Sequence, residues 1–482
     1  MLISGLALGA VLGFVMQRGR FCVTGFLRDI FTQRSWRGFV ALLIVISVHA
    51  IGLAALTSAG VITPEYNELA PVAVIVGGVI FGLGIVLAGG CASGTWYRSG
   101  EGLIGSWIAL VFYALSAAAM KTGFLGGLQN SLKDRTVGLT SIHASLGISI
   151  WPLVIALSAV TAYFAVRFLR EEFSGPRPVT LAPRKTGLAH ILAEKPWHVY
   201  ATAAIVGALG VLAWPLSAAT GRNDGLGITT PSSNLANYVV TGDTERFDWG
   251  VLLVLGILVG SFIAAKASGE FRLRVPDATQ GARSVVGGIF MGVGAAWAGG
   301  CTVGNGMVQT SLFSYQGWLA LASIAAGVAI AAKLWLKPSA PSLNDVPSAP
   351  STTNDTAVSA TAPVASAATS PVSLPGSDSA GAAGTEASPL AGSFAVAPVA
   401  LLDRSVVKQE DGKLKPLGDG RYELDTVGAV CPFPLIEAKD AINKIEVGEE
   451  LVIPFDCTQA TDAIPRWAAK DGHEVTNFEQ TG

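Results

Sequence analysis

The chain has 482 residues, of which 51% are hydrophobic and only 14% charged, and its formal net charge is −2. Because a soluble globular protein carries about 25% charged residues, this composition argues against a wholly soluble protein. The near-neutral charge argues against a nucleic-acid partner. Five cysteines without a Cys-x-x-Cys pair predict neither a disulfide framework nor a metal site, and no cofactor is expected.

Residues 1–337 are predicted to form an α-helical polytopic membrane domain in the lipid bilayer. Their apolar runs approach the roughly 20 residues that a helix needs to cross a bilayer. No Lys or Arg precedes Arg18, so we expect the first run to be a helix and not a signal peptide. Nine spans are expected, at 2–17, 37–58, 70–89, 102–121, 146–168, 197–217, 248–266, 284–300 and 317–336.

The basic residues of the connecting loops predict how these spans are oriented. If the N-terminus lies outside, most of the Lys and Arg residues in the loops fall on the inner side. We therefore expect the N-terminus outside and the last span to end in the cytoplasm.

An internal repeat is the strongest pattern in these spans. The glycine-rich block that ends at Cys91 recurs, 210 residues later, in the block that ends at Cys301. Cys22 follows glycines at the same spacing, and a weaker fourth copy places Gly269 at the cysteine position. In the predicted topology the spans that end at Cys91 and Cys301 run in opposite directions. The sequence therefore predicts inverted repeats, which are common in secondary transporters.

Each block ends in a Gly-Gly pair, Gly89–Gly90 and Gly299–Gly300, directly before its cysteine. Such a pair weakens a helix, so we expect a break at membrane depth that lines a cavity, followed by a short helix. The free N–H groups of the short helix would favour an anion, and thiols would add weak donors. Arg20 and Arg98 lie near the breaks and support an anion, although both residues also suit ordinary membrane anchors. A packing role is the alternative for the cysteines.

After the membrane domain, residues 338–403 are predicted to be a disordered linker. Ala, Ser, Pro and Thr dominate there, and Lys, Arg and His are absent. About 60 such residues have a root-mean-square reach of roughly 45 Å. Residues 404–482 are predicted to form a small two-layer α/β domain. Its expected strands are 421–425, 450–455 and 473–478, and its expected helices are 432–445 and 459–470.

Residues 1–337 resemble the YeeE/YedE family of sulfur-transport membrane proteins. The resemblance rests on the repeated Gly-Gly-Cys blocks, the segment Arg18–Cys22 and the nine spans. It implies uptake of thiosulfate through the bacterial cytoplasmic (inner) membrane. It further implies a path in which Cys22, Cys91 and Cys301 pass the ion along by S–H···S contacts.

The C-terminal domain resembles the TusA/SirA/YeeD family of sulfur carriers. The resemblance rests on Cys431-Pro432-Phe433-Pro434 and on shorter matches over about 60 residues. A thiol at a helix N-terminus has a lowered pKa and is more nucleophilic. Cys431 is therefore the candidate catalytic residue, which would take sulfur from thiosulfate as a persulfide and release sulfite. Cys457 stands where many carriers have proline, and we favour a packing role for it over a chemical one.

Three functions are consistent with these patterns. The first is a thiosulfate transporter with an attached cytoplasmic sulfur acceptor, which would pass sulfur to other cytoplasmic sulfur-accepting proteins. The second is a membrane-anchored sulfurtransferase that transports nothing, and the repeat argues against it because an anchor needs one span. The third is a transporter of another sulfur or selenium oxyanion. The chain is thus expected to be primarily a transporter, with the C-terminal domain a candidate sulfurtransferase.

Overall fold

The computed structural model describes most of the membrane domain and of the C-terminal domain. The described residues are 2–176, 178–180, 185–336, 414–427, 429, 433–456 and 459–479. The predicted linker at 338–403, Cys431 and Cys457 lie outside them.

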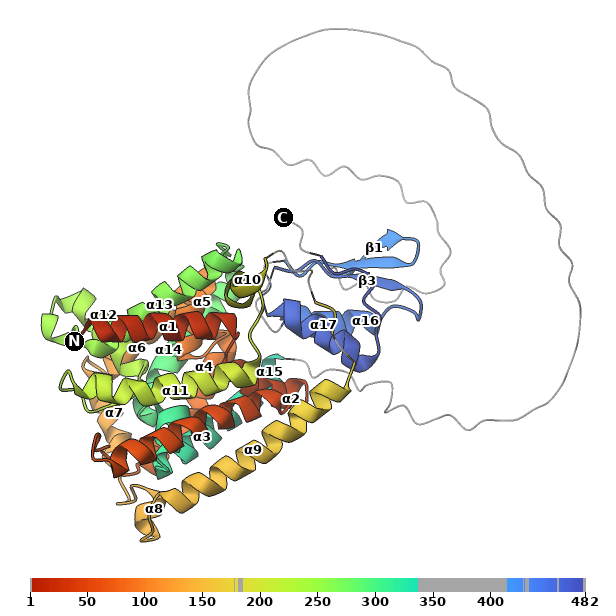
Figure 1. Cartoon of the computed structure of the whole chain (residues 1–482). Coiled ribbons are helices and arrows are strands. Elements are labelled where there is room, and N and C mark those ends of the chain that lie inside the picture. Colours follow the sequence, from red (N-terminus) through yellow and green to blue (C-terminus); the bar gives the residue numbers. More distant parts are fainter. Residues whose placement is uncertain are drawn as a thin grey trace, which may run out of the picture. The chain divides into compact units, whose positions relative to one another are not determined.

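Helices make up nearly all the regular structure of residues 2–336 (Figure 1). They are α1 (Ile3–Arg18), α2 (Val23–Thr32), α3 (Arg37–Ser58), α4 (Pro71–Leu87), α5 (Ala92–Gly100), α6 (Ile104–Lys121), α7 (Gly126–Lys133), α8 (Ile142–Ser145), α9 (Trp151–Ser174), α10 (Gly187–Ala193), α11 (Val199–Ala218), α12 (Thr229–Thr241), η1 (Thr244–Arg246), α13 (Trp249–Ser268), α14 (Ala278–Ala298), η2 (Gly304–Gln309) and α15 (Tyr315–Trp335).

Within the described part of the chain, eight helical stretches are long and apolar enough to cross a membrane. They are Ile3–Thr32, Arg37–Ser58, Pro71–Gly100, Ile104–Lys121, Trp151–Ser174, Val199–Ala218, Trp249–Ser268 and Tyr315–Trp335. The remaining predicted span, 284–300, corresponds to α14, whose first turns are less apolar because they carry Gln280, Arg283 and Ser284. The polytopic helical architecture predicted from the sequence is therefore confirmed.

Four repeat units share one plan, which is a long helix, a break, a short helix and a second long helix. Unit 1 is α1–α3, unit 2 is α4–α6, unit 3 is α11–α13, and unit 4 consists of α14, η2 and α15. Helix α9 belongs to none of them and packs on α3, where the Ser47 hydroxyl donates to Thr161 Oγ1 at 2.8 Å.

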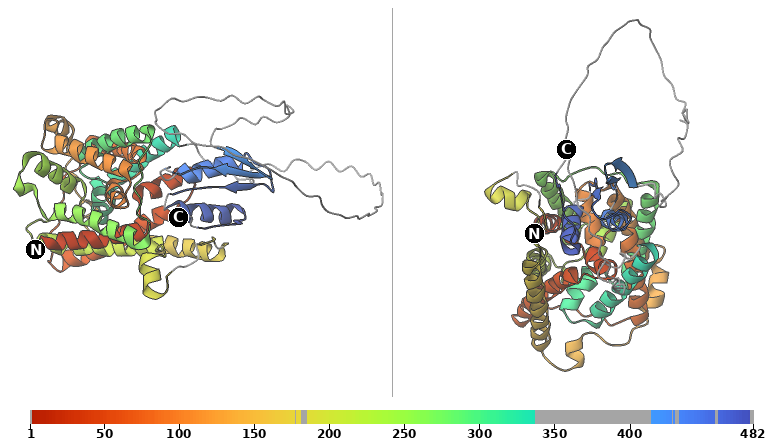
Figure 2. Two further views of the ribbon diagram at one scale, coloured as in Figure 1. Left: turned by 90° about the horizontal axis from the view of Figure 1, so that it is seen from above. Right: turned by 90° about the vertical axis from the view of Figure 1, so that its right-hand side faces the viewer.

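The units pack in pairs. In units 1 and 3, α1 packs on α13 and α3 on α11, and in units 2 and 4, α4 packs on α15 and α6 on α14. The first long helix of each unit thus lies on the second long helix of its partner, as two copies related by an approximate two-fold axis would. The red α1 and the green α13 run side by side in Figures 1 and 2.

The repeated glycines explain how closely the paired helices approach. A Cβ atom on Gly9 or Gly13 of α1 would overlap a backbone carbonyl of α13, and Gly82 of α4 meets α15 in the same way. Gly288 of α14 meets the carbonyl of Ala109 on α6. The glycine spacing shared by the cysteine blocks is therefore a spacing of helix contacts.

The predicted fourth copy of the repeat is wrong in its position. Gly256 and Gly260 are the residues of α13 against which α1 packs. Gly269 is the C-cap residue of α13 and has a left-handed backbone conformation. The fourth unit instead begins with α11, whose Gly207 contacts the carbonyl of Val45 on α3. Its break falls at 219–228, and its short helix is α12.

The C-terminal domain has the strands β1 (Leu414–Gly418), β2 (Arg421–Leu424) and β3 (Glu450–Val452) and the helices α16 (Phe433–Ile442) and α17 (Ala460–Asp471). The sheet order is β1-β2-β3, with β1 antiparallel and β3 parallel to β2. Its core gathers Leu424, Leu435, Ala438, Ile464 and Trp467. The small α/β fold is confirmed.

Two expectations about the strands are wrong. Residues 473–478 are not a strand, and they touch β3 through the hydroxyl of Thr476, which donates to Glu450 at 2.6 Å. Strand β1, which the sequence did not predict, pairs with β2 through a hairpin turn in which Asp419 and Gly420 both have positive φ.

Candidate functional site

The short helices begin at or near the cysteines. Cys22 is the N-cap residue of α2, and Cys91 is the N-cap residue of α5. The preceding helices end at glycines, and Gly89 (φ 71°) and Gly299 (φ 79°) adopt the left-handed conformation that glycine tolerates best. The Gly-Gly pairs therefore break their spans as predicted, and Gly90 and Gly300 lead directly into Cys91 and Cys301.

The thiols of Cys22 and Cys91 lie beside the first turn of α5. A Cβ atom on Gly94 would lie 3.4 Å from Cys91 Sγ and 3.7 Å from Cys22 Sγ, so both thiols lie beside the same glycine. The Gly94 amide also donates to Cys91 Sγ at 3.4 Å. Both cysteines are buried, so units 1 and 2 contribute one enclosed pair of sulfur atoms.

Arg98 brings positive charge to this pair of thiols. It is buried on α5, its guanidinium acts electrostatically on Cys22, and its Nη1 donates to the carbonyl oxygen of Gly89. The ring of Tyr97 packs against Arg98, with 5.9 Å from the guanidinium carbon to the ring centroid. The break of unit 2 thus combines a thiol, a cation and a helix N-terminus, which together suit an anion.

Arg20, also predicted as a supporting residue, points elsewhere. It has a positive φ of 48°, and its Nη2 donates to Glu270 Oε1 at 3.2 Å. The other Glu270 oxygen accepts from Gln17 at 2.6 Å and from Arg18 at 3.3 Å. Burial raises the pKa of Glu270, but the charges of Arg20 and Arg18 outweigh it, so the pKa lies below its usual value. Glu270 therefore stays ionised and holds both arginines.

Glu101 lies directly after α5 and next to this ionic group. It is buried, and burial raises its pKa to about 7 despite the nearby charge of Arg98. The carboxyl of Glu101 is therefore partly protonated near neutral pH, which lowers the cost of burying it.

Cys301 occupies the break of unit 4 and is buried as well. The hydroxyl of Tyr113 on α6 lies near Cys301. The same hydroxyl donates to Thr229 Oγ1 at 2.8 Å. Tyr113 therefore links the thiol of unit 4 with unit 2 and with the first residue of α12.

Asn305 fixes the backbone of this break. Its Nδ2 donates to the carbonyl oxygens of Ala298 at 2.8 Å and Gly300 at 3.0 Å, and its Oδ1 accepts from Gln316 Nε2 at 3.0 Å. All three bonds are buried, so the position of Cys301 depends on them.

Replacing Asn305 with alanine is expected to lower both the melting temperature and the transport rate. The change leaves two carbonyls and one amide buried without partners, at about 1–3 kcal/mol for each group. Thermal unfolding in detergent and uptake into liposomes would measure the two effects. Asn237→Ala is the control, because that amide bonds Thr122 in an exposed position. Normal uptake by Asn305→Ala would show that the break does not depend on this residue.

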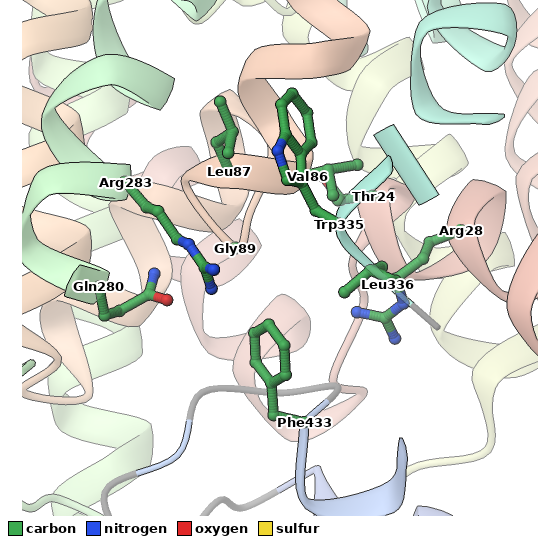
Figure 3. Close-up of a pocket in the computed structure, with 10 residues that line it drawn as sticks. All are labelled: Thr24, Arg28, Val86, Leu87, Gly89, Gln280, Arg283, Trp335, Leu336 and Phe433. Carbon is green, nitrogen blue, oxygen red and sulfur yellow. The ribbon is translucent and has the colours of Figure 1, made fainter. Parts of the chain in front are cut away.

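One pocket borders the breaks of units 1 and 2, and Figure 3 shows Arg28 and Arg283 on opposite sides of it. Its empty volume is about 450 Å³. Thr24 lies two residues after Cys22, Gly89 lies two residues before Cys91, and the Thr24 hydroxyl is buried without a partner. The lining residues are Thr24, Arg28, Val86, Leu87, Gly89, Gln280, Arg283, Trp335, Leu336 and Phe433.

Sequence patterns identified the thiols but missed the polar groups between them. Tyr113 sits in an ordinary apolar span, and Thr229, Ser232 and Ser233 fall in a segment that we predicted to be a loop. The Gly-rich run 225–227 followed by Thr and Ser was the available signal for a helix start. Cys431, the predicted catalytic residue, lies outside the described residues, so its role stays a prediction.

Comparisons with known families agree with this two-part organisation. Residues 18–330 match the family model described as sulphur transport. Residues 422–482 match the model described as sulfurtransferase TusA.

Individual relatives also match either the membrane domain or the C-terminal domain. A thiosulfate transporter, TsuA of Escherichia coli (strain K12), is 51% identical over 328 residues, which are 68% of this chain and 93% of the relative. Another TsuA, from Spirochaeta thermophila, is 32% identical over 337 residues, which are 66% of this chain and 94% of the relative. The putative sulfur carrier protein TsuB of E. coli is 62% identical over 60 residues, which are 12% of this chain and 80% of the relative.

Proposed function

The chain belongs to the sulphur-transport family, and from that membership we propose that it carries thiosulfate into the cell. In this proposal the ion crosses the cytoplasmic membrane along a path that includes Cys22, Cys91 and Cys301. The N-terminus lies outside, and the C-terminal domain lies in the cytoplasm. The observation that carries the proposal is the burial of three thiols at three helix breaks, with two of them beside the same glycine, Gly94.

The chemistry of the breaks suits an ion with one soft end. Thiosulfate carries its charge on three oxygens and on a terminal sulfur that is large and polarizable. Thiols offer weak S–H donors and polarizable contacts to that sulfur, whereas the N-termini of α2 and α5 favour negative charge. A path of weak contacts also lets the ion leave each position, which conduction requires.

The pocket beside Cys22 and Cys91 provides a route onward from the thiol pair. Arg28 and Arg283 lie on opposite sides of it, and because Arg28 is paired with Asp29 at 2.8 Å, Arg283 supplies most of the positive charge that would attract a dianion. We place the inner end of the path here, because Arg28 and Arg283 both lie on the side that the loop charges assign to the cytoplasm.

The C-terminal domain would consume the ion that arrives. The Cys431 thiolate attacks the terminal sulfur of thiosulfate, the bond between the two sulfur atoms breaks, and sulfite leaves with the electron pair. Cys431 keeps the transferred sulfur as a persulfide, ready for a cytoplasmic acceptor protein. The predicted linker 338–403 would hold such a domain at an effective concentration in the millimolar range, so removal of thiosulfate at the exit would keep uptake running downhill.

Uptake of radiolabelled thiosulfate into liposomes that contain the purified chain tests this proposal. The full chain is expected to take up label, and a chain that ends at Lys337 should do so more slowly, because the acceptor is missing but the path is present. Liposomes with Asn305→Ala serve as the low-uptake reference.

Two outcomes would contradict the proposal. Uptake by neither chain, with sulfite still released outside the liposomes, would favour a membrane-anchored sulfurtransferase. Uptake of selenium or other sulfur oxyanions in preference to thiosulfate would change the substrate and leave the path intact. Complete loss of uptake on truncation would show that the two domains act only together.

A further inference from the structure

Unit 3 has no cysteine, and hydroxyl groups take the place of the thiol. Its short helix α12 begins with Thr229, and Ser232 and Ser233 follow in its first turn and a half. Residues at positions i, i+3 and i+4 lie on one face of a helix, so these three hydroxyls share one face. All three residues are buried.

This hydroxyl face of α12 contacts the units that carry thiols. Thr229 Oγ1 accepts from the Tyr113 hydroxyl at 2.8 Å, and that hydroxyl also lies near Cys301. Ser232 Oγ accepts from the indole Nε1 of Trp96 at 2.9 Å and donates to the Ile228 carbonyl at 2.7 Å, so Ser232 positions α12 against α5, five residues after Cys91. This hydroxyl face of α12 therefore points toward the part of the membrane domain in which the thiols lie.

Two buried hydroxyls in this region have no hydrogen-bond partner. They belong to Ser233, which is 1% exposed, and to Thr302, which is 0% exposed and follows Cys301 directly. A buried hydroxyl without a partner costs about 1–3 kcal/mol, and most buried polar groups are therefore paired. Two such groups next to a thiol-lined interior indicate that a bound ligand completes their hydrogen bonds.

We propose that Thr229, Ser233 and Thr302 form a subsite for the oxygen end of the transported sulfur oxyanion. The proposal rests on the proposed function, because it assigns the two ends of the ion to different groups. Hydroxyls and the free N–H groups at the start of α12 are strong donors to charged oxygens. Thiols are weak donors that suit a polarizable sulfur.

The subsite would fix the direction in which the ion travels past the thiols. With its oxygens on the hydroxyl face, the ion turns its terminal sulfur toward Cys301 and then toward Cys91 and Cys22. The subsite would also select for tetrahedral oxyanions over soft anions that lack oxygen. The expected ligand class is a tetrahedral sulfur oxyanion with at least one face of charged oxygens.

The test measures binding of two anions to the purified full-length chain by calorimetry. Thiosulfate has charged oxygens and a terminal sulfur, whereas sulfate has charged oxygens only. Ser233→Ala and Thr302→Val are expected to weaken both anions by roughly tenfold each, since each removes one hydrogen bond to a charged group. Neither change removes a hydrogen bond of the protein itself, so folding should be preserved. Cys91→Ala should weaken thiosulfate more than sulfate.

Thr241→Val is the matched control, because Thr241 lies at the opposite end of α12, where its exposed hydroxyl donates to the Asn237 carbonyl and accepts from the Asp243 amide. Unchanged affinities of Ser233→Ala and Thr302→Val for both anions would overturn the subsite. If the chain bound sulfate through these hydroxyls but did not bind thiosulfate, the subsite would stand and the proposed substrate would be wrong. If the wild-type chain bound neither anion, both proposals would be rejected.

Discussion

Replacing Cys91 or Cys301 with alanine is expected to stop growth on thiosulfate as sole sulfur source, while the chain still reaches the membrane. Each thiol is buried at a helix break, where the ion would have to leave its water. The loss of one donor in such a site costs about 1–3 kcal/mol, which corresponds to a fall in transport of roughly 5-fold to more than 100-fold. Growth rates and uptake of labelled thiosulfate would measure the effect.

Replacing the same cysteines with serine distinguishes a chemical role of the thiol from a packing role. Cys91→Ser keeps a donor of similar size but loses the polarizable sulfur, so we expect part of the activity to return. The control is Ser323→Ala, which removes one buried atom from α15 where the hydroxyl bonds only the Leu319 carbonyl of its own helix. Normal growth of Cys91→Ala and Cys301→Ala, with a lowered melting temperature, would show that these thiols only pack.

The pairs Gly77–Gly78 and Gly287–Gly288 stay helical inside α4 and α14, where they pack against neighbouring helices, so a Gly-Gly pair alone does not predict a break. The sequence predicted the breaks because two further pairs stand directly before Cys91 and Cys301. The left-handed Gly89 and Gly299 are the direct result of those pairs. The same reasoning failed for the fourth unit. Gly256 and Gly260 match the repeat spacing, but they do so because they are the positions where α13 meets Gly9 and Ala10 of α1. The same glycine spacing occurs on both helices of a packed pair. The spacing alone therefore does not tell which of the two helices leads into a break.

The polar groups of the interior were beyond prediction for a different reason. Tyr113 belongs to α6, Thr229 to α12 and Trp96 to α5, and their contacts join segments more than 100 residues apart. Arg20 shows the opposite case, since its closeness to Cys22 in the sequence suggested an anion site, yet its side chain pairs with Glu270. Side-chain direction depends on backbone conformation, and the positive φ of Arg20 was not visible in the sequence.

The second large effect concerns the carrier domain. Cys431→Ser in the full-length chain is expected to abolish both sulfite release from thiosulfate and the gain of one sulfur atom by the peptide that holds residues 431–434. An alcohol is far less ionised than a thiol near neutral pH and is a poor nucleophile toward sulfur, so a loss of at least roughly 1,000-fold is expected. Mass spectrometry of the digested protein would detect the persulfide, and a sulfite assay would follow the leaving group.

Cys457→Ser is the matched control for this experiment, because it removes the other thiol of the same domain. We expect it to reduce sulfur transfer only in part, if at all, since the Cys-Pro-x-Pro element surrounds Cys431 and not Cys457. The helix that follows supports this assignment, because α16 begins at Phe433 and its N-terminus would stabilise a thiolate two residues earlier. A persulfide on Cys457 in the Cys431→Ser chain would reverse the two roles. The absence of added sulfur on either cysteine of the wild-type chain would instead identify the domain as a module that binds without transferring sulfur.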